Sequence, residues 1–258
     1  MSWSARQYRR FEQARNRPIV DLLSRLPRDG VTRAIDIGCG PGNSTELLKR
    51  RYPQADICGI DASPNMIAAA RTRLPNIDFQ QADIGSWHAS PPFELILANA
   101  VLQWLPGHDT LFPHLLSQLA PGGHLAVQMP DNLDEPAHLA MREVAARPHW
   151  AQALGDVAAL RAKRHDPAWY ASLLEEHTSQ IDIWRTTYHH MLIFGVDGVI
   201  EWFKGSALRP YLDRLSADDS QAFLAEYREA IAGVYPALAD GALLLPFPRL
   251  FMVLTAPD

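Results

Sequence analysis

The stretch AIDIGCGPGNS, residues 34–44, decides the fold. A short apolar run that contains one acid, Asp36, leads into glycines at positions 38, 40 and 42, and polar residues typical of a helix start follow. Glycines let the backbone approach a ligand closely and adopt left-handed φ values. In parallel α/β sheets, ligands bind beyond the carboxyl ends of the strands, where helix amides face them. The stretch therefore predicts a strand, a ligand-binding loop and a helix, in this order.

The residues that follow repeat the pattern of a strand and then a helix. Strands are expected at 32–37, 56–61, 77–83, 93–101 and 124–129, and helices at 43–52, 65–74 and 110–119. Asn43 or Ser44 is expected to cap the first of these helices, and Ser63 with Pro64 to begin the second. Repeated βα units form parallel sheets with helices on both faces. The predicted fold class is therefore α/β, with a doubly wound, mostly parallel and Rossmann-like sheet.

The C-terminal half has a different pattern. Residues 131–168 are polar, helical and interrupted by prolines. A strongly alternating run at 180–193 predicts a long strand, helices are expected at 196–212 and 216–235, and residues 248–256 predict a final strand. We expect a single domain over residues 1–258 with helical insertions in this half. Within it we expect an N-terminal lid or helix at 1–30, a cofactor-binding core at 31–130, and substrate-side helices and the last strands at 131–258.

The composition excludes several classes of protein. The chain has 258 residues and a net charge of −5, whereas a nucleic-acid-binding protein needs a basic face. No apolar run is long enough for a membrane helix, and the polar, basic N-terminus is unlike a secretory signal. Cys39 and Cys58 fit neither a disulfide framework nor a zinc site, and adjacent His189 and His190 would point to opposite faces of a strand. We therefore expect a cytoplasmic protein that binds no nucleic acid, no membrane and no metal.

The spacing of the glycines separates the ligands that such a loop can bind. A dinucleotide fingerprint has its third glycine at the sixth position, which here is Asn43, and a P-loop ends in a lysine that this stretch lacks. Both observations argue against a diphosphate. Asp61 and Asp83 follow the next two expected strands. A carboxylate at the first place can accept from both hydroxyls of a ribose, and one at the second can accept from an adenine amino group.

Several of these stretches resemble the successive motifs of the class I S-adenosylmethionine-dependent methyltransferases. They are AIDIGCGPGNST, GIDASPNMIAAAR, QADIGSW, FELILANAVLQWLP and LAPGGHLAVQMP, which span residues 33–130. The resemblance implies S-adenosyl-L-methionine as cofactor and S-adenosyl-L-homocysteine as product. It implies the cofactor-binding residues Asp36, Gly38, Gly40, Gly42, Asp61, Ala62, Met66, Asp83, Ile84 and Asn99.

The resemblance also implies where the parts of the cofactor lie. The glycine loop would follow the methionine part, Asp61 would bind the ribose, and Asp83 with the Ile84 amide would bind the adenine amino group. Met66 would lie near the adenine and Asn99 near the sulfonium. Asp36 would bond the loop backbone or the ammonium of the cofactor, because a buried acid is tolerated when amides or a cation meet its charge.

Stretches outside this core carry a second resemblance. YRRFEQARNRPIVDLL, QIDIWRTTYHHML, EWFKGSALRPYL and LPFPRLFMVLTA resemble a bacterial methyltransferase family that forms the monomethyl ester of trans-aconitate. A site for this small tricarboxylate needs groups that hold two carboxylates and leave one facing the methyl group, and bidentate arginine suits this task. The substrate-binding residues we expect are Trp3, Tyr8, Tyr188, Arg209 and Arg249, and the positioning residues are Tyr8, Gln103 and Trp104.

A carboxylate acceptor needs no general base, because it is already ionised at neutral pH. We therefore expect in-line methyl transfer that depends on alignment and removal of water, with no essential proton-transfer residue. Three alternatives remain open. In the first, the chain is a carboxyl methyltransferase of another acid, such as a malonyl thioester on a carrier protein. In the second, the chain is a non-catalytic module that binds the same cofactor. The third, a nicotinamide oxidoreductase, is disfavoured by Asn43.

Overall fold

The structure, a computed structural model, describes residues 12–157 and 164–258, so Trp3 and Tyr8 lie outside the described residues. Contacts divide the described chain into two compact units. The first unit contains the residues up to Pro130 together with Arg164–Thr186 and Leu250–Asp258. The second contains the residues from Asp131 to position 157 and Thr187–Arg249. The single domain and its expected subdivisions stay a prediction.

The described residues form one seven-stranded sheet in the order β3-β2-β1-β4-β5-β7-β6. Its strands are β1 (Arg33–Ile37), β2 (Asp56–Asp61), β3 (Asp78–Gln81), β4 (Phe93–Asn99), β5 (Leu119–Pro130), β6 (Gln180–Leu192) and β7 (Leu243–Thr255). The pairs β1–β2, β1–β4, β2–β3 and β4–β5 are parallel. Ile37 opposes Ile60, so β1 and β2 end side by side. The strand order reverses between β1 and β4, which is where ligands bind in sheets of this kind.

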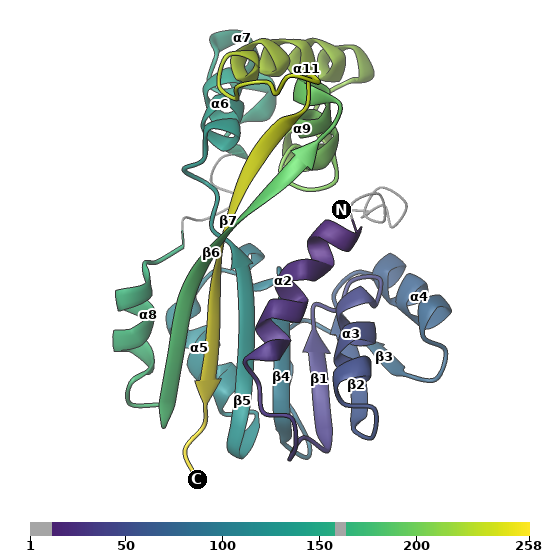
Figure 1. The fold of residues 1–258 in the computed structure, drawn as a ribbon, viewed down its shortest axis with the longest axis vertical. Helices are drawn as coiled ribbons and strands as arrows, with labels where there is room; N and C mark the ends of the chain where they lie inside the picture. The colour runs from purple at the N-terminus through teal and green to yellow at the C-terminus, as the bar shows by residue number, and fades with distance from the viewer. Residues whose placement is uncertain (1–11, 158–163) are drawn as a thin grey trace. The chain divides into compact units, whose positions relative to one another are not determined.

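β7 runs antiparallel to β5, which makes the sheet mixed. Backbone hydrogen bonds join Ala256 to Gly123 and Asp131 to Pro248, so the order of partners is reversed along the two strands. Figure 1 shows the arrowheads of β7 and β1 pointing in opposite directions. The long strand expected at 180–193 is confirmed as β6, and the expected final strand begins earlier than predicted, at Leu243. The α/β, mostly parallel, Rossmann-like fold class is confirmed.

Helices cover both faces of the sheet in the first unit. They are α2 (Glu12–Ser24), α3 (Asn43–Arg51), α4 (Pro64–Arg73), α5 (His108–Leu116) and α8 (Pro167–Leu174), with the short 3₁₀ helix η1 (Leu102–Trp104) after β4. Side chains alternate along β1, so Ile35 and Ile37 join the apolar core formed with α5 and α8, and Asp36 points to the opposite face. Figure 1 shows α2 and α3 crossing in front of the strands on that opposite face.

The second unit contains the helical insertions that the sequence predicts. Its helices are α6 (Pro136–Ala145), α7 (Pro148–Leu154), α9 (Gly195–Lys204), α10 (Arg209–Leu212) and α11 (Ala217–Ala232). α11 packs against α6 and α9, and its Phe223 and Tyr227 are fully buried. The Tyr227 hydroxyl donates a hydrogen bond to the Ala137 carbonyl at 3.1 Å. This bond ties α11 to the start of α6 inside an otherwise aromatic core.

The predicted helix starts are confirmed at α4 and corrected at α3. The Ser63 side chain accepts a hydrogen bond from the Met66 amide, and Pro64 occupies the first helical position, as expected. At α3 the N-cap is Gly42, with φ 87° and no side-chain cap, so the prediction of Asn43 or Ser44 was wrong. The reason is that tertiary partners take both side chains. Asn43 donates to Asn16 of α2, and Ser44 donates to Asp36.

Candidate functional site

The glycine loop lies at the ends of β1 and β2, and its amides are bonded inside the protein. Gly38, Gly40 and Gly42 have φ values of 68°, 54° and 87°, which side chains rarely adopt. The amides of Gly38 and Cys39 both donate to the Ile60 carbonyl, at 2.7 and 2.9 Å. The Gly40 amide donates to Asp61 Oδ2 at 2.9 Å. Three successive loop amides are thus hydrogen-bonded within the protein, whereas a phosphate-binding loop presents its amides to the phosphate.

The segment after β4 approaches the glycine loop closely. A Cβ atom at Gly38 would lie 2.3 Å from the Val101 side chain, so only glycine fits there. Ala100, directly before Val101, has φ 54°, the left-handed conformation that non-glycine residues avoid. Strained backbone of this kind concentrates at functional sites. Val101 is a site residue that the sequence analysis missed, because nothing local in the sequence signals its contact with Gly38.

Asp36 is fully buried below the loop. Its Oδ2 accepts hydrogen bonds from the hydroxyls of Ser44, at 2.7 Å, and Thr45, at 2.6 Å. Burial raises the pKa of Asp36 to about 7; the two hydroxyls lower it to a smaller extent, and the charge of Asp61 raises it. Loop amides were expected as its protein partners, but those amides bond to Ile60 and Asp61 instead. Ser44 and Thr45 were missed, although hydroxyls in the first turn after the loop were a visible signal.

Three buried acceptor oxygens in this region have no hydrogen-bond partner among the described residues. They are Asp36 Oδ1, Asn99 Oδ1 and Gln103 Oε1, and no other buried side-chain oxygen of the described chain is in this situation. Asn99 ends β4, and Gln103 lies in η1, with its Nε2 donating to the Ala100 carbonyl at 2.7 Å. A buried acceptor without a partner is costly. A bound group with donors or positive charge fits here, and a diphosphate, which only accepts, does not.

Asp61 and Asp83 lie where the sequence predicts, Asp61 as the last residue of β2 and Asp83 shortly after β3. Asp61 Oδ1 accepts from the Ser63 amide at 2.8 Å, and burial raises its pKa although the amides of Ser63 and Gly40 act against this. Asp83 is exposed, and its Oδ1 accepts from the Gly85 amide at 2.8 Å. Of the other residues predicted to bind the cofactor, Met66 and Ile84 are buried and Ala62 is exposed. These positions form the adenosine side of the predicted cofactor site.

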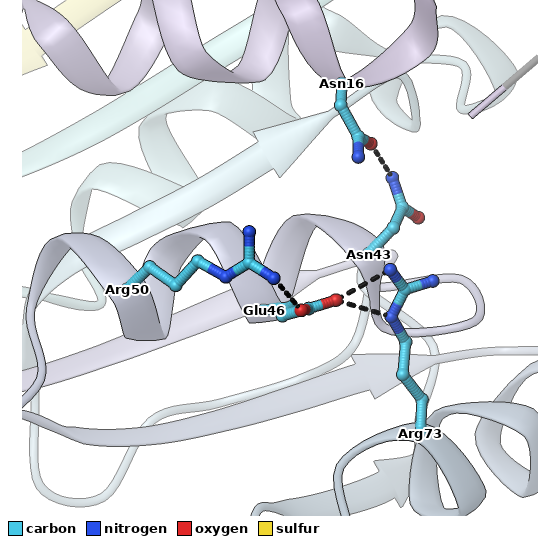
Figure 2. A network of polar contacts seen from close by, with 5 residues as sticks. All are labelled: Asn16, Asn43, Glu46, Arg50 and Arg73. Atoms are coloured by element: carbon cyan, nitrogen blue, oxygen red, sulfur yellow. Dashed lines mark hydrogen bonds and ion pairs between the residues drawn. The ribbon is translucent and has the colours of Figure 1, made fainter. Parts of the chain in front are cut away.

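A polar network holds the first turn of α3 between its neighbours (Figure 2). Asn43 Nδ2 donates to Asn16 Oδ1 of α2 at 2.8 Å. Glu46 accepts from Arg73 at the end of α4, with 2.8 Å between Arg73 Nε and Glu46 Oε2, and from Arg50 one turn further along α3. Desolvation raises the pKa of Glu46, but the hydrogen bonds and charges of Arg73 and Arg50 outweigh it and lower that pKa. The helix that follows the glycine loop is thereby fixed to α2 and α4.

The described residues predicted to bind the substrate, Tyr188, Arg209 and Arg249, belong to the second unit. The predicted cofactor residues and the predicted positioning residues Gln103 and Trp104 belong to the first. Arg249 is only 4% exposed, and its guanidinium carbon lies 4.8 Å from the centre of the Phe247 ring. That ring contacts His190, whose own ring stacks near Tyr188. Tyr188 and Arg249 thus belong to one buried cluster. Arg209 begins α10, with its Nε 3.5 Å from Asp213 Oδ2.

Histidines give no support to a metal site. His190 is buried and stacks on Trp202 with ring centres 4.3 Å apart, whereas His189 is exposed, so the two point to opposite faces as expected. Across residues 12–157 and 164–258, no three side chains of His, Cys, Asp or Glu are grouped so as to hold a metal ion. Over the same residues, no helix has the length and apolar character needed to cross a membrane.

Known proteins similar to this chain show its family. A methyltransferase domain family matches residues 8–209. The chain is 53% identical over 251 residues to the trans-aconitate 2-methyltransferase of Methylobacterium nodulans, covering 97% of each chain. It is 49% identical over 257 residues to the protein of the same name from Rhizobium meliloti, covering 99% of each. The chain belongs to the trans-aconitate 2-methyltransferase family. Both resemblances stated from the sequence are confirmed, and the chain is a methyltransferase.

Solved structures share the fold of this member of the trans-aconitate 2-methyltransferase family at low sequence identity. The YcgJ protein of Bacillus subtilis superimposes with a TM-score of 0.60 at 12% identity, covering 94% of this chain and 99% of that one. Phosphoethanolamine N-methyltransferase 2 of Haemonchus contortus, solved with S-adenosyl-L-methionine, has a TM-score of 0.58 at 16% identity and covers 94% and 53%. At these identities the likeness concerns the fold alone.

Proposed function

We propose that this protein transfers the methyl group of S-adenosyl-L-methionine to one carboxylate of trans-aconitate, which yields the monomethyl ester and S-adenosyl-L-homocysteine. The family supports the acid substrate, because relatives that match nearly the whole chain carry the name trans-aconitate 2-methyltransferase. The observation that carries the cofactor is the pair of acceptors Asp36 Oδ1 and Asn99 Oδ1, which have no hydrogen-bond partner among the described residues. The ammonium, hydroxyl and amino groups of this cofactor are the donors that such acceptors require.

The first unit would hold the cofactor through backbone and carboxylates. When bound, S-adenosyl-L-methionine supplies an electrophilic methyl group on a sulfonium. Gly38 lets Val101 pack against the loop, where a side chain would collide with it, and Asp36 and Asn99 offer acceptors toward positive charge. We assign Asp61 to the ribose hydroxyls and Asp83 to the adenine amino group. The remaining positions proposed to line the cofactor are Gly40, Gly42, Ala62, Met66 and Ile84.

The second unit would supply the groups that recognise the acid. Arg249 and Tyr188 are 4% and 2% exposed, and a guanidinium away from water binds a carboxylate more strongly than one on the surface. Arg209 would hold a second carboxylate. We propose that Gln103 and Trp104 position the third carboxylate toward the methyl group. Trp3 and Tyr8 belong to the same proposal and lie outside the described residues.

The chemistry proposed here needs no general base. Carboxylates of trans-aconitate are ionised well below neutral pH, so the nucleophile is present before binding. The protein's task is to orient the acid in line with the methyl group and to strip water from the attacking oxygen. We expect kcat to show no titrating base between about pH 6 and pH 9. A pH–rate profile with a limb that disappears on mutation of one histidine would contradict this mechanism.

The test is a panel of acids incubated with the enzyme and a methyl donor labelled in its methyl group. Trans-aconitate, cis-aconitate, citrate, a dicarboxylate and a malonyl-loaded carrier protein are compared, and ester products are identified by mass spectrometry. We expect ester from trans-aconitate at the highest kcat/KM. If only the malonyl-loaded carrier protein gave an ester, that carrier and not trans-aconitate would be the substrate. Cofactor binding in calorimetry without turnover of any acid would make the chain a binding module.

We propose a cytoplasmic location. Cys39 and Cys58 are both free thiols, and burial raises the pKa of each, so they stay protonated. A reducing compartment suits such residues. Fractionation of cells that express the chain, followed by immunoblotting, tests the location.

A further inference from the structure

The short helix η1 is held by two side-chain hydrogen bonds, from Gln103 and His108, in addition to its backbone bonds. Gln103 Nε2 donates to the Ala100 carbonyl at 2.7 Å, which closes the turn on itself. His108, the first residue of α5, bonds through Nε2 to the Leu102 carbonyl at 2.9 Å. The second bond anchors η1 to a packed helix. It matters because η1 follows directly on Ala100, with its strained φ of 54°, and Val101, which touches Gly38.

The two contacts of the His108 ring determine where its proton lies. Nε2 faces a backbone carbonyl, which can only accept, so Nε2 carries the proton. In a neutral ring Nδ1 then accepts, and its partner is the Tyr170 hydroxyl of α8 at 2.6 Å. Tyr170 therefore donates to Nδ1 and selects the tautomer in which Nε2 can hold η1. Both side chains are buried, His108 at 7% exposure and Tyr170 at 0%.

The surroundings keep this ring neutral. Desolvation lowers the pKa of His108, and the charges of His165 and Arg164 lower it further. The carbonyls of Leu102 and Leu105 act in the opposite direction without reversing the result. Phe112 packs on the ring with centres 5.3 Å apart, and the Tyr170 ring lies 5.8 Å away. A neutral, sterically confined imidazole is suited to fixing backbone geometry.

We propose that His108 is a positioning residue for methyl transfer, which holds η1 through the Leu102 carbonyl while Tyr170 fixes its tautomer. Sequence analysis assigned it no role, because its partners lie 6 and 62 residues away along the chain. The inference rests on the proposed function, since Gln103 and Trp104 of η1 are the residues proposed to align the acid. The inference adds that this alignment depends on the buried pair His108 and Tyr170, which lies outside the site. Loss of the pair misplaces the acid more than the cofactor.

The tautomer is tested without any turnover. Nitrogen–proton correlation spectra of the imidazole rings, with His108 assigned by its loss in His108→Gln, should show the Nε2-protonated neutral form at neutral pH. In Tyr170→Phe the signal should shift as Nδ1 loses its donor. A His108 ring protonated on Nδ1, or a spectrum unaffected by Tyr170→Phe, would overturn the inference whatever acid the enzyme methylates.

The kinetic test compares His108→Phe, which keeps the bulk of the ring, with His108→Gln, whose amide nitrogen can still donate toward Leu102. In His108→Phe we expect kcat with trans-aconitate to fall roughly tenfold to a hundredfold, as small misplacements do. His108→Gln should recover most of that loss. Calorimetric affinity for the cofactor should change by less than about threefold in both, because the cofactor's contacts stay in place. Circular dichroism confirms that each variant is folded.

His114→Gln is the matched control. His114 lies on the same helix, and its Nε2 likewise bonds a backbone carbonyl, that of Trp87, at 2.8 Å, but away from η1. It should keep wild-type kinetics. A folded His108→Phe with wild-type kcat, or with cofactor affinity and kcat lost in equal proportion, would overturn the inference. Should His108→Phe not fold, Tyr170→Phe decides by the same criteria. A wild-type enzyme inactive on trans-aconitate overturns the proposed substrate and leaves the tautomer result standing.

Discussion

Asp36 shows how one buried side chain connects the fold to ligand charge. With burial complete and its pKa near 7, the residue can be neutral or charged under ordinary conditions. One oxygen takes the hydroxyls of Ser44 and Thr45, and the other has no partner among the described residues. A cation arriving at that second oxygen would stabilise the charged form. The residue therefore costs stability in the protein alone and gains a partner on binding.

Asp36→Asn should reveal this cost as a pH dependence of stability. The folded-state pKa, about 7, is above the ordinary aspartate pKa of 3.8, so the favourable contribution of the protonated acid is full below the lower pKa and is lost as pH rises through the upper one. The uncharged amide does not titrate. Without cofactor, we expect the difference in thermal midpoint, variant minus wild type, to increase by at least about 3 °C between about pH 5 and pH 8. Parallel curves in differential scanning fluorimetry would refute the assignment.

Asp61→Ala should weaken cofactor binding. The carboxylate is held by the amides of Gly40 and Ser63, which aim it at the proposed position of the ribose. A hydrogen bond to a charged group is worth about 1.5–3 kcal/mol, so we expect a loss of roughly tenfold to a hundredfold in affinity. Isothermal titration calorimetry measures it. Asp56→Ala, at the other end of β2, removes the same charge and should bind normally; unchanged affinity in Asp61→Ala would remove the ribose assignment.

Helix starts in this chain are determined in two ways. At α4, α8 and α11 a side chain accepts a hydrogen bond from the first turn, from Ser63, Asp166 and Ser216 respectively. At α3 the cap is Gly42, and the polar side chains that follow turn away to Asn16 and Asp36. The helix next to the site instead gives its first side chains to tertiary contacts.

Ser216→Ala should destabilise the protein without changing catalysis. Ser216 Oγ accepts from the Asp219 amide at 3.1 Å and donates to the Asp219 carboxylate at 2.7 Å, so its side chain caps the start of α11. Loss of such a cap costs about 1 kcal/mol. We expect a lower midpoint in urea unfolding and unaltered kcat and KM. Ser220→Ala, one turn into α11, is the control and should not lower the midpoint; an equal loss there would mean that the cap contributes nothing.

Across the whole molecule, the proposed cofactor residues all lie in one unit, whereas the proposed acid-binding residues are divided, with Gln103 and Trp104 in the first unit. All ten proposed cofactor positions lie in the first unit, and Tyr188, Arg209 and Arg249 lie in the second. Methyl transfer needs both ligands at once. The two long strands β6 and β7 have residues in each unit, so the chain links the units through its sheet as well as through loops. Mutations of Tyr188, Arg209 and Arg249 should therefore affect the acid rather than the cofactor.

Arg249→Ala and Arg209→Ala should raise KM for trans-aconitate with little change in cofactor affinity. Each removes one charge-assisted contact to a carboxylate, which predicts a rise of roughly tenfold or more. Steady-state kinetics with varied acid, together with calorimetry of the cofactor, separates the two effects. Arg214→Ala, an exposed arginine that follows α10, is the control. If both variants keep the wild-type KM, these arginines do not hold the substrate.

Local patterns were enough for most of the fold and for the chemical class of the site. Alternation along residues 180–193, glycines at 38, 40 and 42, and acids after successive strands are all readable from neighbouring positions. They predict strands, a loop with left-handed φ values and carboxylates at one sheet edge. Parallel pairing then brings those carboxylates together without further information, because the carboxyl ends of parallel strands share an edge.

The sequence alone determined the strands, the glycine loop and the family of this protein, because each follows from the spacing of residues that are close together along the chain. Only folding decided which amides Ile60 and Asp61 would take, where Ser44 and Thr45 would turn, and which acceptors would stay without partners. Those outcomes depend on contacts such as Gly40 with Asp61 and His108 with Tyr170, made 21 and 62 residues apart. Hydrogen bonds at that separation follow from packing of the whole sheet and its helices, which no local pattern encodes.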